Sequence, residues 1–193
     1  SLSNCQALLD IFRSGEDIAN YFLEQMPHSF FAPLYIANCV TNNGVVVKDF
    51  GGNVEQGTQV LSRYPICSVG NKFYYGNYKV GYDATHFKEK DWTRSILVVI
   101  ISLPNDKKIK IIDVHGIWNL TRMGDDRTVA QSEFIIAELL RDKMPTIVAG
   151  DFNLLPESQS IKMLGRYLTN LPVEYKLKTT RPKSDDDKKC MVL

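Results

Sequence analysis

The chain has 193 residues, of which 44% are hydrophobic and 23% charged, and its 23 Lys and Arg against 22 Asp and Glu leave a net charge of +1. These values indicate one globular domain over residues 1–193, and a chain of this length folds without structural metal ions or disulfides. The balanced charge argues against binding nucleic acid or anionic lipid through a global basic field. A locally basic groove stays compatible with it.

The sequence also predicts the environment of the chain. Its longest apolar segment, 96–103, has the length of a buried strand and falls short of the roughly 20 residues of a membrane span. We therefore expect no membrane-spanning segment. The cysteines Cys5, Cys39, Cys67 and Cys190 lie far apart with no C-x-x-C pair, which favours reduced thiols and a cytoplasmic location.

The first half of the chain predicts a helix followed by short strands. Apolar residues at helical spacing indicate a helix over 3–26, ended by Pro27. Runs of β-forming residues then predict strands over 30–37, 44–50, 58–61, 73–78, 93–103 and 108–117. The expected breaks between these strands are Asn42-Asn43-Gly44, Gly51-Gly52-Asn53, Tyr64-Pro65 and Gly70-Asn71.

The second half predicts helices around one further strand. A helix is expected over 124–143, with Val129, Ile136 and Leu140 as its apolar stripe. A strand over 145–150, a loop over 151–156 and a helix over 157–167 follow. From Leu171 we expect an exposed charged loop that leads into a strand over 190–193. Because strands outnumber helices and the two are interleaved, the fold class is α+β with a largely antiparallel sheet core.

The first candidate site is Gly150-Asp-Phe-Asn153, which follows an apolar strand. Residues two apart on an extended backbone face the same way, so Asp151 and Asn153 are expected to project together. A carboxylate binds a divalent cation or takes a proton from water, and an amide holds a phosphate oxygen. The alternative is a simple turn, which the composition alone favours by about two to one because Gly, Asp and Asn are ordinary turn residues.

Two further strand ends carry polar residues. Asp113 and His115 end the strand over 108–117, where a histidine either steadies a carboxylate and donates to a phosphoryl oxygen or serves a purely structural role. Arg94 opens the strand over 93–103. Its planar guanidinium suits a phosphate, although a solvated arginine at a strand end is an equally good interpretation.

In their order along the chain, these motifs resemble the endonuclease/exonuclease/phosphatase superfamily. This superfamily comprises metal-dependent hydrolases that include DNase I-like nucleases, inositol polyphosphate phosphatases and neutral sphingomyelinases. The resemblance covers about residues 56–160. The matching positions are Gly57 to Ile66 (GTQVLSRYPI), which is similar to the family's "ILSRYPI", Arg94, Asp113-Val-His115, Asp126-Arg127, Gln131, Gly150-Asp-Phe-Asn153, Pro156, Ser158 and Ile161.

The resemblance implies a DNase I-like β-sandwich, flanked by helices, that hydrolyses phosphoesters with Mg²⁺ or Mn²⁺. By their place in the family's motifs, Asp151 would bind the metal ion or activate the attacking water, and Asn153 would hold the scissile phosphate. His115 would stabilise charge on the phosphoryl oxygens. Arg94 would contact a phosphate, and Trp118 would cover the substrate, although a Trp118 packed within the fold is an equally good interpretation.

The sequence departs from the family in two motifs. A metal-binding Glu on an early strand and a final Ser-Asp-His are both missing, since Glu24 lies in a predicted helix, Glu55 in a Gly-rich loop, and Ser184-Asp185 lacks the histidine. Both motifs belong at the ends of the family's domain, so we expect the sequence to be an internal fragment of a longer protein. Unpaired strand edges in such a fragment would favour association between copies.

Two functions stay open at this point. The first is a divalent-metal-dependent phosphodiesterase or phosphomonoesterase, impaired in this span by its missing motifs. The second is a non-catalytic relative that acts as a binding or interaction module. The substrate is open between nucleic acid, small phosphate esters and a lipid headgroup, because Tyr74, Tyr75, Tyr78 and the Lys-rich tail indicate nucleic acid only weakly. The sequence does not indicate an oligomeric state.

Overall fold

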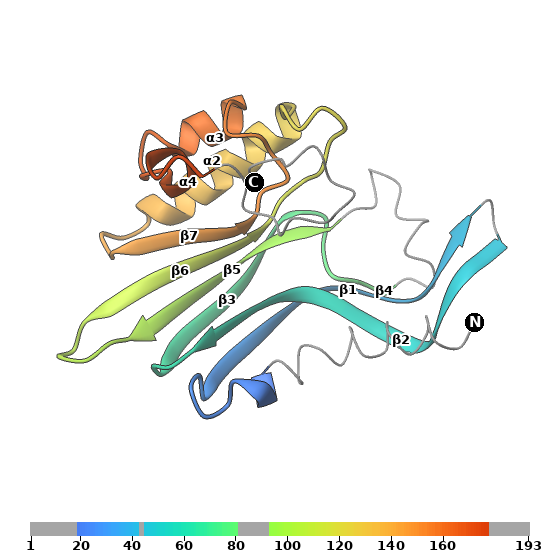
Figure 1. Ribbon diagram of the computed structural model, residues 1–193, viewed down its shortest axis with the longest axis horizontal. Helices are drawn as coiled ribbons and strands as arrows, with labels where there is room; N and C mark the ends of the chain where they lie inside the picture. Colours follow the sequence, from blue (N-terminus) through green and yellow to red (C-terminus); the bar gives the residue numbers. More distant parts are fainter. Residues whose placement is uncertain (1–18, 43–44, 81–92, 178–193) are drawn as a thin grey trace. The chain divides into compact units, whose positions relative to one another are not determined.

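The computed structural model describes residues 19–42, 45–80 and 93–177. Most of the predicted N-terminal helix lies outside these residues. Its described end, 19–21, is helical and is followed by turns over 22–25. The chain then enters the first of two sheets (Figure 1).

The first sheet has three strands in the order β2-β1-β4. Its strands are β1 (His28–Asn42), β2 (Val45–Ser62) and β4 (Lys79–Val80). Strands β1 and β2 pair antiparallel along their whole length, and β4 pairs parallel to β1. The pairing is close at Gly57, because a Cβ there would collide with the carbonyl oxygen of Ala32 and lie 2.7 Å from Phe31 Cζ.

The predicted break at residues 51–53 is wrong, because β2 continues through it. The strand pairing moves from Ala37 opposite Val54 to Cys39 opposite Asp49, so the residues between form a bulge and do not end the strand. Gly51 permits this with a φ of 69°, and its N–H donates to Asp49 Oδ1 at 2.8 Å. A glycine inside a strand pattern therefore marked a bulge.

The second sheet has four strands in the order β3-β5-β6-β7. They are β3 (Ile66–Tyr75), β5 (Arg94–Ser102), β6 (Lys108–His115) and β7 (Thr146–Asp151). The strands predicted at the positions of β5, β6 and β7 are confirmed to within two residues at each end. The predicted break at Gly70-Asn71 is wrong, because both residues pair with β5 inside β3.

Residues from the two sheets share one apolar core. Its buried members are Ala32 of β1 and Leu97, Val99 and Ile101 of β5, and residues of β2, β3 and β6 pack against them. Burying each large aliphatic side chain contributes about 1.5 to 3 kcal/mol. Two sheets with few helices confirm the predicted α+β sandwich.

The helices are α2 (Asp126–Leu140), α3 (Gln159–Leu164) and α4 (Leu171–Glu174). The predicted apolar stripe of α2 is wrong: Leu140 is 59% exposed. The buried residues of α2 are instead Thr128, Gln131, Ser132, Ile135 and Glu138. Two of its polar side chains bond outside the helix, Gln131 to the loop at Ile117 and Thr128 to Ser160 of α3. At the predicted exposed loop the chain forms α4, and the predicted strand over 190–193 lies outside the described residues.

The chain divides into two compact units, whose boundary crosses β6 and β7. Unit 1 comprises Ser1–Asp113 and Met144–Val148, and unit 2 comprises Val114–Lys143 and Ala149–Leu193. Unit 1 contains the core described above. Unit 2 contains α2, α3 and α4, of which α2 and α3 pack together. A single domain over the whole chain stays a prediction.

The structure bears on the expected membrane segments, thiols and strand edges. Within the described ranges, no helix is both long and apolar enough to cross a membrane. Cys39 and Cys67 form no disulfide. Strand β7 lies at one edge of its sheet, with Ile147 49% exposed. Association between copies through such edges, and a cytoplasmic location, stay predictions.

Candidate active site

The ends of β6 and β7 bring together the two motifs that the sequence singled out. Strand β6 ends at His115 and its neighbour β7 ends at Asp151. The N–H of Gly116 donates to the carbonyl oxygen of Asp151 at 2.7 Å. The two strand ends therefore lie side by side.

A glycine is required where these strand ends meet. A Cβ on Gly116 would collide with the carbonyl oxygen of Phe152 and lie 2.6 Å from its carbonyl carbon. The carbonyl oxygen of Gly116 in turn accepts a hydrogen bond from Asn153 Nδ2 at 3.2 Å. The residue after His115 thus packs directly on the backbone of the Gly-Asp-Phe-Asn segment.

Asp151 and Asn153 do not project together, which corrects the expectation from strand periodicity. Asn153 has a φ of 56°, in the left-handed region, and its N–H donates to Asp151 Oδ1 at 2.8 Å. This is the turn that the composition favoured. As a result Asp151 is exposed, whereas Asn153 is 7% exposed.

The side-chain amide of Asn153 is held at both ends. Its Oδ1 accepts from Arg122 Nη1 at 2.8 Å, and its Nδ2 donates to Gly116. The Arg122 guanidinium also lies 5.5 Å from the ring of Trp118, a cation–π contact. Trp118 itself is 38% exposed, so it lies at the surface beside these residues.

The sequence did not single out Arg122. It has a φ of 59° in a loop without periodicity, and its partner Asn153 is 31 residues away along the chain. The one sequence signal is its position four residues after Trp118 in the loop that follows the His115 strand.

A buried hydrogen-bond network supports this loop from α2 and α3. Gln131 Oε1 accepts from the N–H of Ile117 at 2.8 Å. Thr128 Oγ1 lies 2.9 Å from Ser160 Oγ, and Ser158 Oγ accepts from the N–H of Ile161 at the start of α3. Gln131 and Ser158, two positions of the family resemblance, therefore serve the packing of the loops and helices.

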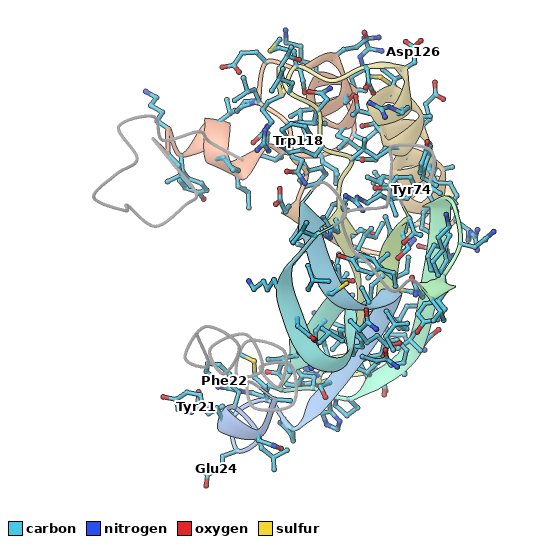
Figure 2. The ribbon with its side chains drawn as sticks, turned by 90° about the vertical axis from the view of Figure 1, so that its right-hand side faces the viewer. Tyr21, Phe22, Glu24, Tyr74, Trp118 and Asp126 are labelled. Carbon is cyan, nitrogen blue, oxygen red and sulfur yellow. The ribbon has the colours of Figure 1, made fainter. Side chains whose placement is uncertain are left out.

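The N-terminus of α2 is capped by Asp125, and not by Asp126. Asp125 forms a capping box with Thr128, and its carboxylate also pairs with Arg127 at 2.6 Å. The hydrogen bond from Arg127 lowers the pKa of Asp125, and the N–H of Thr128 lowers it further. Figure 2 shows Asp126 at the start of α2 and Trp118 apart from it in the preceding loop.

Arg94 belongs to unit 1, whereas His115, Trp118, Asp151 and Asn153 belong to unit 2. The Nη1 of Arg94 donates to the carbonyl oxygen of Thr93 at 2.8 Å. Burial raises the pKa of the nearby Tyr74, and the positive charge of Arg94 partly offsets this. A contact of Arg94 with the substrate stays a prediction.

Neither glutamate considered for the missing metal ligand lies in unit 2. Glu24 points away from the turn before β1 (Figure 2). Glu55 lies on β2, and not in a loop as predicted. Its Oε1 accepts from the Tyr78 hydroxyl at 2.7 Å, and this bond raises the pKa of Tyr78.

The side chains at these strand ends provide one ligand for a metal ion. Mg²⁺ is commonly held by one or two carboxylates together with waters and substrate phosphates. The exposed carboxylate of Asp151 fits one such ligand. In the ranges that the structure describes, no group of three or more His, Cys, Asp and Glu is placed to hold a metal ion.

Comparison by sequence finds no matching family model and no matching curated protein. Comparison of the fold finds an endonuclease/exonuclease/phosphatase from Beutenbergia cavernae, 18% identical over 77% of this chain, with a TM-score of 0.54. It also finds ANGEL2, a 2',3'-cyclic phosphatase, 14% identical over 80% of this chain, with a TM-score of 0.50.

The chain spans only part of these structures, covering 37% of the first and 40% of the second. At such identities the similarity concerns the fold alone. Within that limit, the resemblance stated from the sequence motifs is confirmed. The chain has the DNase I-like fold of endonuclease/exonuclease/phosphatase proteins.

Proposed function

We propose that the protein is a divalent-metal-dependent phosphoester hydrolase with its site at the ends of β6 and β7. The observation that carries this proposal is the exposed carboxylate of Asp151 beside the end of the His115 strand. One of its oxygens is fixed by the N–H of Asn153. Its other oxygen has no hydrogen bond within the described part of the chain, which leaves it open to a metal ion or a water.

The residues divide the work as follows. Asp151 takes the proton of the attacking water or ligates a Mg²⁺ or Mn²⁺ ion. When bound, that ion neutralises charge on the phosphoryl oxygens and lowers the pKa of a bound water. His115 stabilises charge on the same oxygens, and Asn153 orients Asp151 and holds the phosphate through its remaining amide N–H. Trp118 covers the substrate, and Arg94 contacts a phosphate.

The proposal is tested by Asp151→Asn in the full-length protein, because the amide keeps the shape of the side chain but neither takes the proton nor holds the cation. With bis(p-nitrophenyl) phosphate or p-nitrophenyl phosphate and Mg²⁺ or Mn²⁺, we expect turnover to fall about 10²- to 10⁴-fold. The matched control is Glu157→Gln, an exposed carboxylate of the same unit, which should leave turnover unchanged. Equal turnover in Asp151→Asn would overturn the proposal.

A second candidate is a binding module that holds a phosphoester without hydrolysing it. The observation in its favour is that both ends of the Asn153 amide already bond within the protein, to Arg122 and Gly116. Under this candidate, the wild-type protein with Mg²⁺ binds phosphate but turns over neither substrate. Measured turnover would exclude it.

A further inference from the structure

Arg122 carries a positive charge that no carboxylate of the described residues neutralises. Its Nη1 is bonded to Asn153 Oδ1, and its Nε and Nη2 donate to no described residue. Two other arginines of the same unit are paired: Arg127 with Asp125 at 2.6 Å and Arg141 with Glu138 at 3.1 Å. A half-buried guanidinium beside an aromatic ring, without a counter-ion, favours binding of an anion.

The edge of the Arg122 guanidinium that carries Nε and Nη2 can donate two hydrogen bonds to one oxyanion. Arg127 shows this geometry in the same unit, since its Nε and Nη2 both donate to Asp125 Oδ2, at 3.1 and 2.6 Å. In Arg122 the equivalent pair of donors is unoccupied within the described residues, because the single bond to Asn153 comes from Nη1.

The backbone and the ring of Trp118 hold Arg122 in place. Its N–H donates to the carbonyl oxygen of Asn119, and its own carbonyl oxygen accepts from the N–H of Leu155 at 2.8 Å. Its φ of 59° is unfavourable for a non-glycine residue and persists only where surrounding contacts fix it. A guanidinium fixed before the ligand arrives loses little conformational freedom on binding.

We infer that Arg122 binds a phosphate oxygen of the substrate through its Nε and Nη2 while Nη1 keeps Asn153 oriented. This inference rests on the proposed function. Asn153 is hydrogen-bonded to both Arg122 and Asp151. The guanidinium that would bind the phosphate and the carboxylate of Asp151 therefore lie on either side of Asn153. The recognised group is the phosphate itself, which every phosphoester class under consideration carries.

The test is phosphate binding followed by the fluorescence of Trp118, whose ring lies 5.5 Å from the guanidinium. The full chain carries Trp92→Phe, so that Trp118 is its only tryptophan, and is titrated with inorganic phosphate in the presence of Mg²⁺. We expect Arg122→Met to weaken phosphate binding about 10-fold or more, which corresponds to the loss of a charge-assisted hydrogen bond. The control Arg166→Met removes an exposed arginine of the same unit and should leave the affinity unchanged.

Arg122→Lys separates phosphate binding from a purely structural role. Lysine keeps the charge and one donor for Asn153 but lacks the planar edge, so we expect weaker phosphate binding with an unchanged thermal unfolding midpoint. This variant also decides the question if Arg122→Met does not fold. If the parent binds phosphate and Arg122→Lys binds it equally well, the inference is wrong and the proposed function stands. If the parent neither binds phosphate nor hydrolyses the p-nitrophenyl substrates, the proposed function fails and the inference with it.

Discussion

Each of the two units has a different kind of contact in its interior. The core of unit 1 is aliphatic, with Leu97, Val99 and Ile101 buried between its sheets. The buried residues of unit 2 include many polar side chains: Thr128, Gln131, Ser132, Glu138, Asn153, Ser158 and Ser160. Apolar packing depends on area and volume, whereas hydrogen bonds fix the distance and direction of individual atoms. The apolar core of unit 1 is therefore expected to depend mainly on buried area, and the site in unit 2 on hydrogen bonds that fix individual atoms.

The largest effect is expected for Gly116→Ala, because the added methyl group meets the backbone of Phe152 and not a flexible side chain. We expect a loss of about 3 kcal/mol or more. Urea unfolding measures this loss, and NMR shifts of unit 2 amides report the displaced Asp151 turn. Gly165→Ala is the control, since its Cβ would be 3.5 Å from the nearest atom. If Gly116→Ala were as stable as that control, the geometry of unit 2 would not depend on this contact.

In unit 1, Leu97→Ala should cost about 3 kcal/mol, because it opens a cavity in the apolar core. Leu97→Met, which conserves volume, should cost less than about 1.5 kcal/mol. Chemical denaturation of both variants measures the difference. If both variants lost the same free energy of unfolding, this core would depend on the exact shape of Leu97 and not on its volume. The contrast between an apolar unit 1 and a hydrogen-bonded unit 2 would then fail.

Thr128→Val tests the polar network of unit 2 at nearly constant volume. The hydroxyl of Thr128 accepts from the N–H of Asp125 and lies 2.9 Å from Ser160 Oγ. Its removal leaves buried partners unsatisfied, so we expect a loss of about 2 kcal/mol. Thr128→Ser keeps the hydroxyl and should lose clearly less. A double-mutant cycle with Ser160→Ala measures the coupling, which would be near zero if the two hydroxyls did not interact.

The smallest effect concerns the helix cap. Asp125→Ala should cost about 1 kcal/mol at neutral pH, whereas Asp125→Asn should retain most of the capping. Because the fold lowers the pKa of Asp125, the contribution of its charge is complete above its ordinary value of 3.8 and is lost as the pH falls below it. Thermal unfolding from pH 5 down to pH 2 should therefore show a steeper loss in the wild type than in Asp125→Asn. Parallel curves would contradict this.

The sequence predicted the parts of the fold that rest on apolar pattern. Strands β5 and β6 were found because long apolar runs stand out. The buried face of α2 was not found, because residues such as Gln131 and Glu138 are polar and hydrophobic periodicity does not detect them. The sequence predicts a break where β2 has a bulge at Gly51, because glycine marks both and only the pairing with β1 distinguishes them.

The sequence predicted the candidate site in part, for a similar reason. The order of the motifs brought His115 and Asp151 to neighbouring strand ends, which the fold confirms. The buried position of Asn153 was missed, because its left-handed φ breaks the strand period. Arg122 was missed because its bond to Asn153 joins two loops that lie 31 residues apart in the sequence. Such contacts depend on tertiary structure and leave no local pattern.

The close approach at Gly57 has a consequence for how the chain folds. Strands β1 and β2 pair from Asn42 opposite Val45 to His28 opposite Ser62, so pairing can begin at Asn42 and Val45, which the fewest residues separate along the chain. The native register places Gly57, which has no side chain, opposite Pro33 and next to the carbonyl oxygen of Ala32. A slipped register brings a Cβ to that point and is rejected by steric collision. The close contact at Gly57 therefore favours the native register of β1 and β2 over slipped registers.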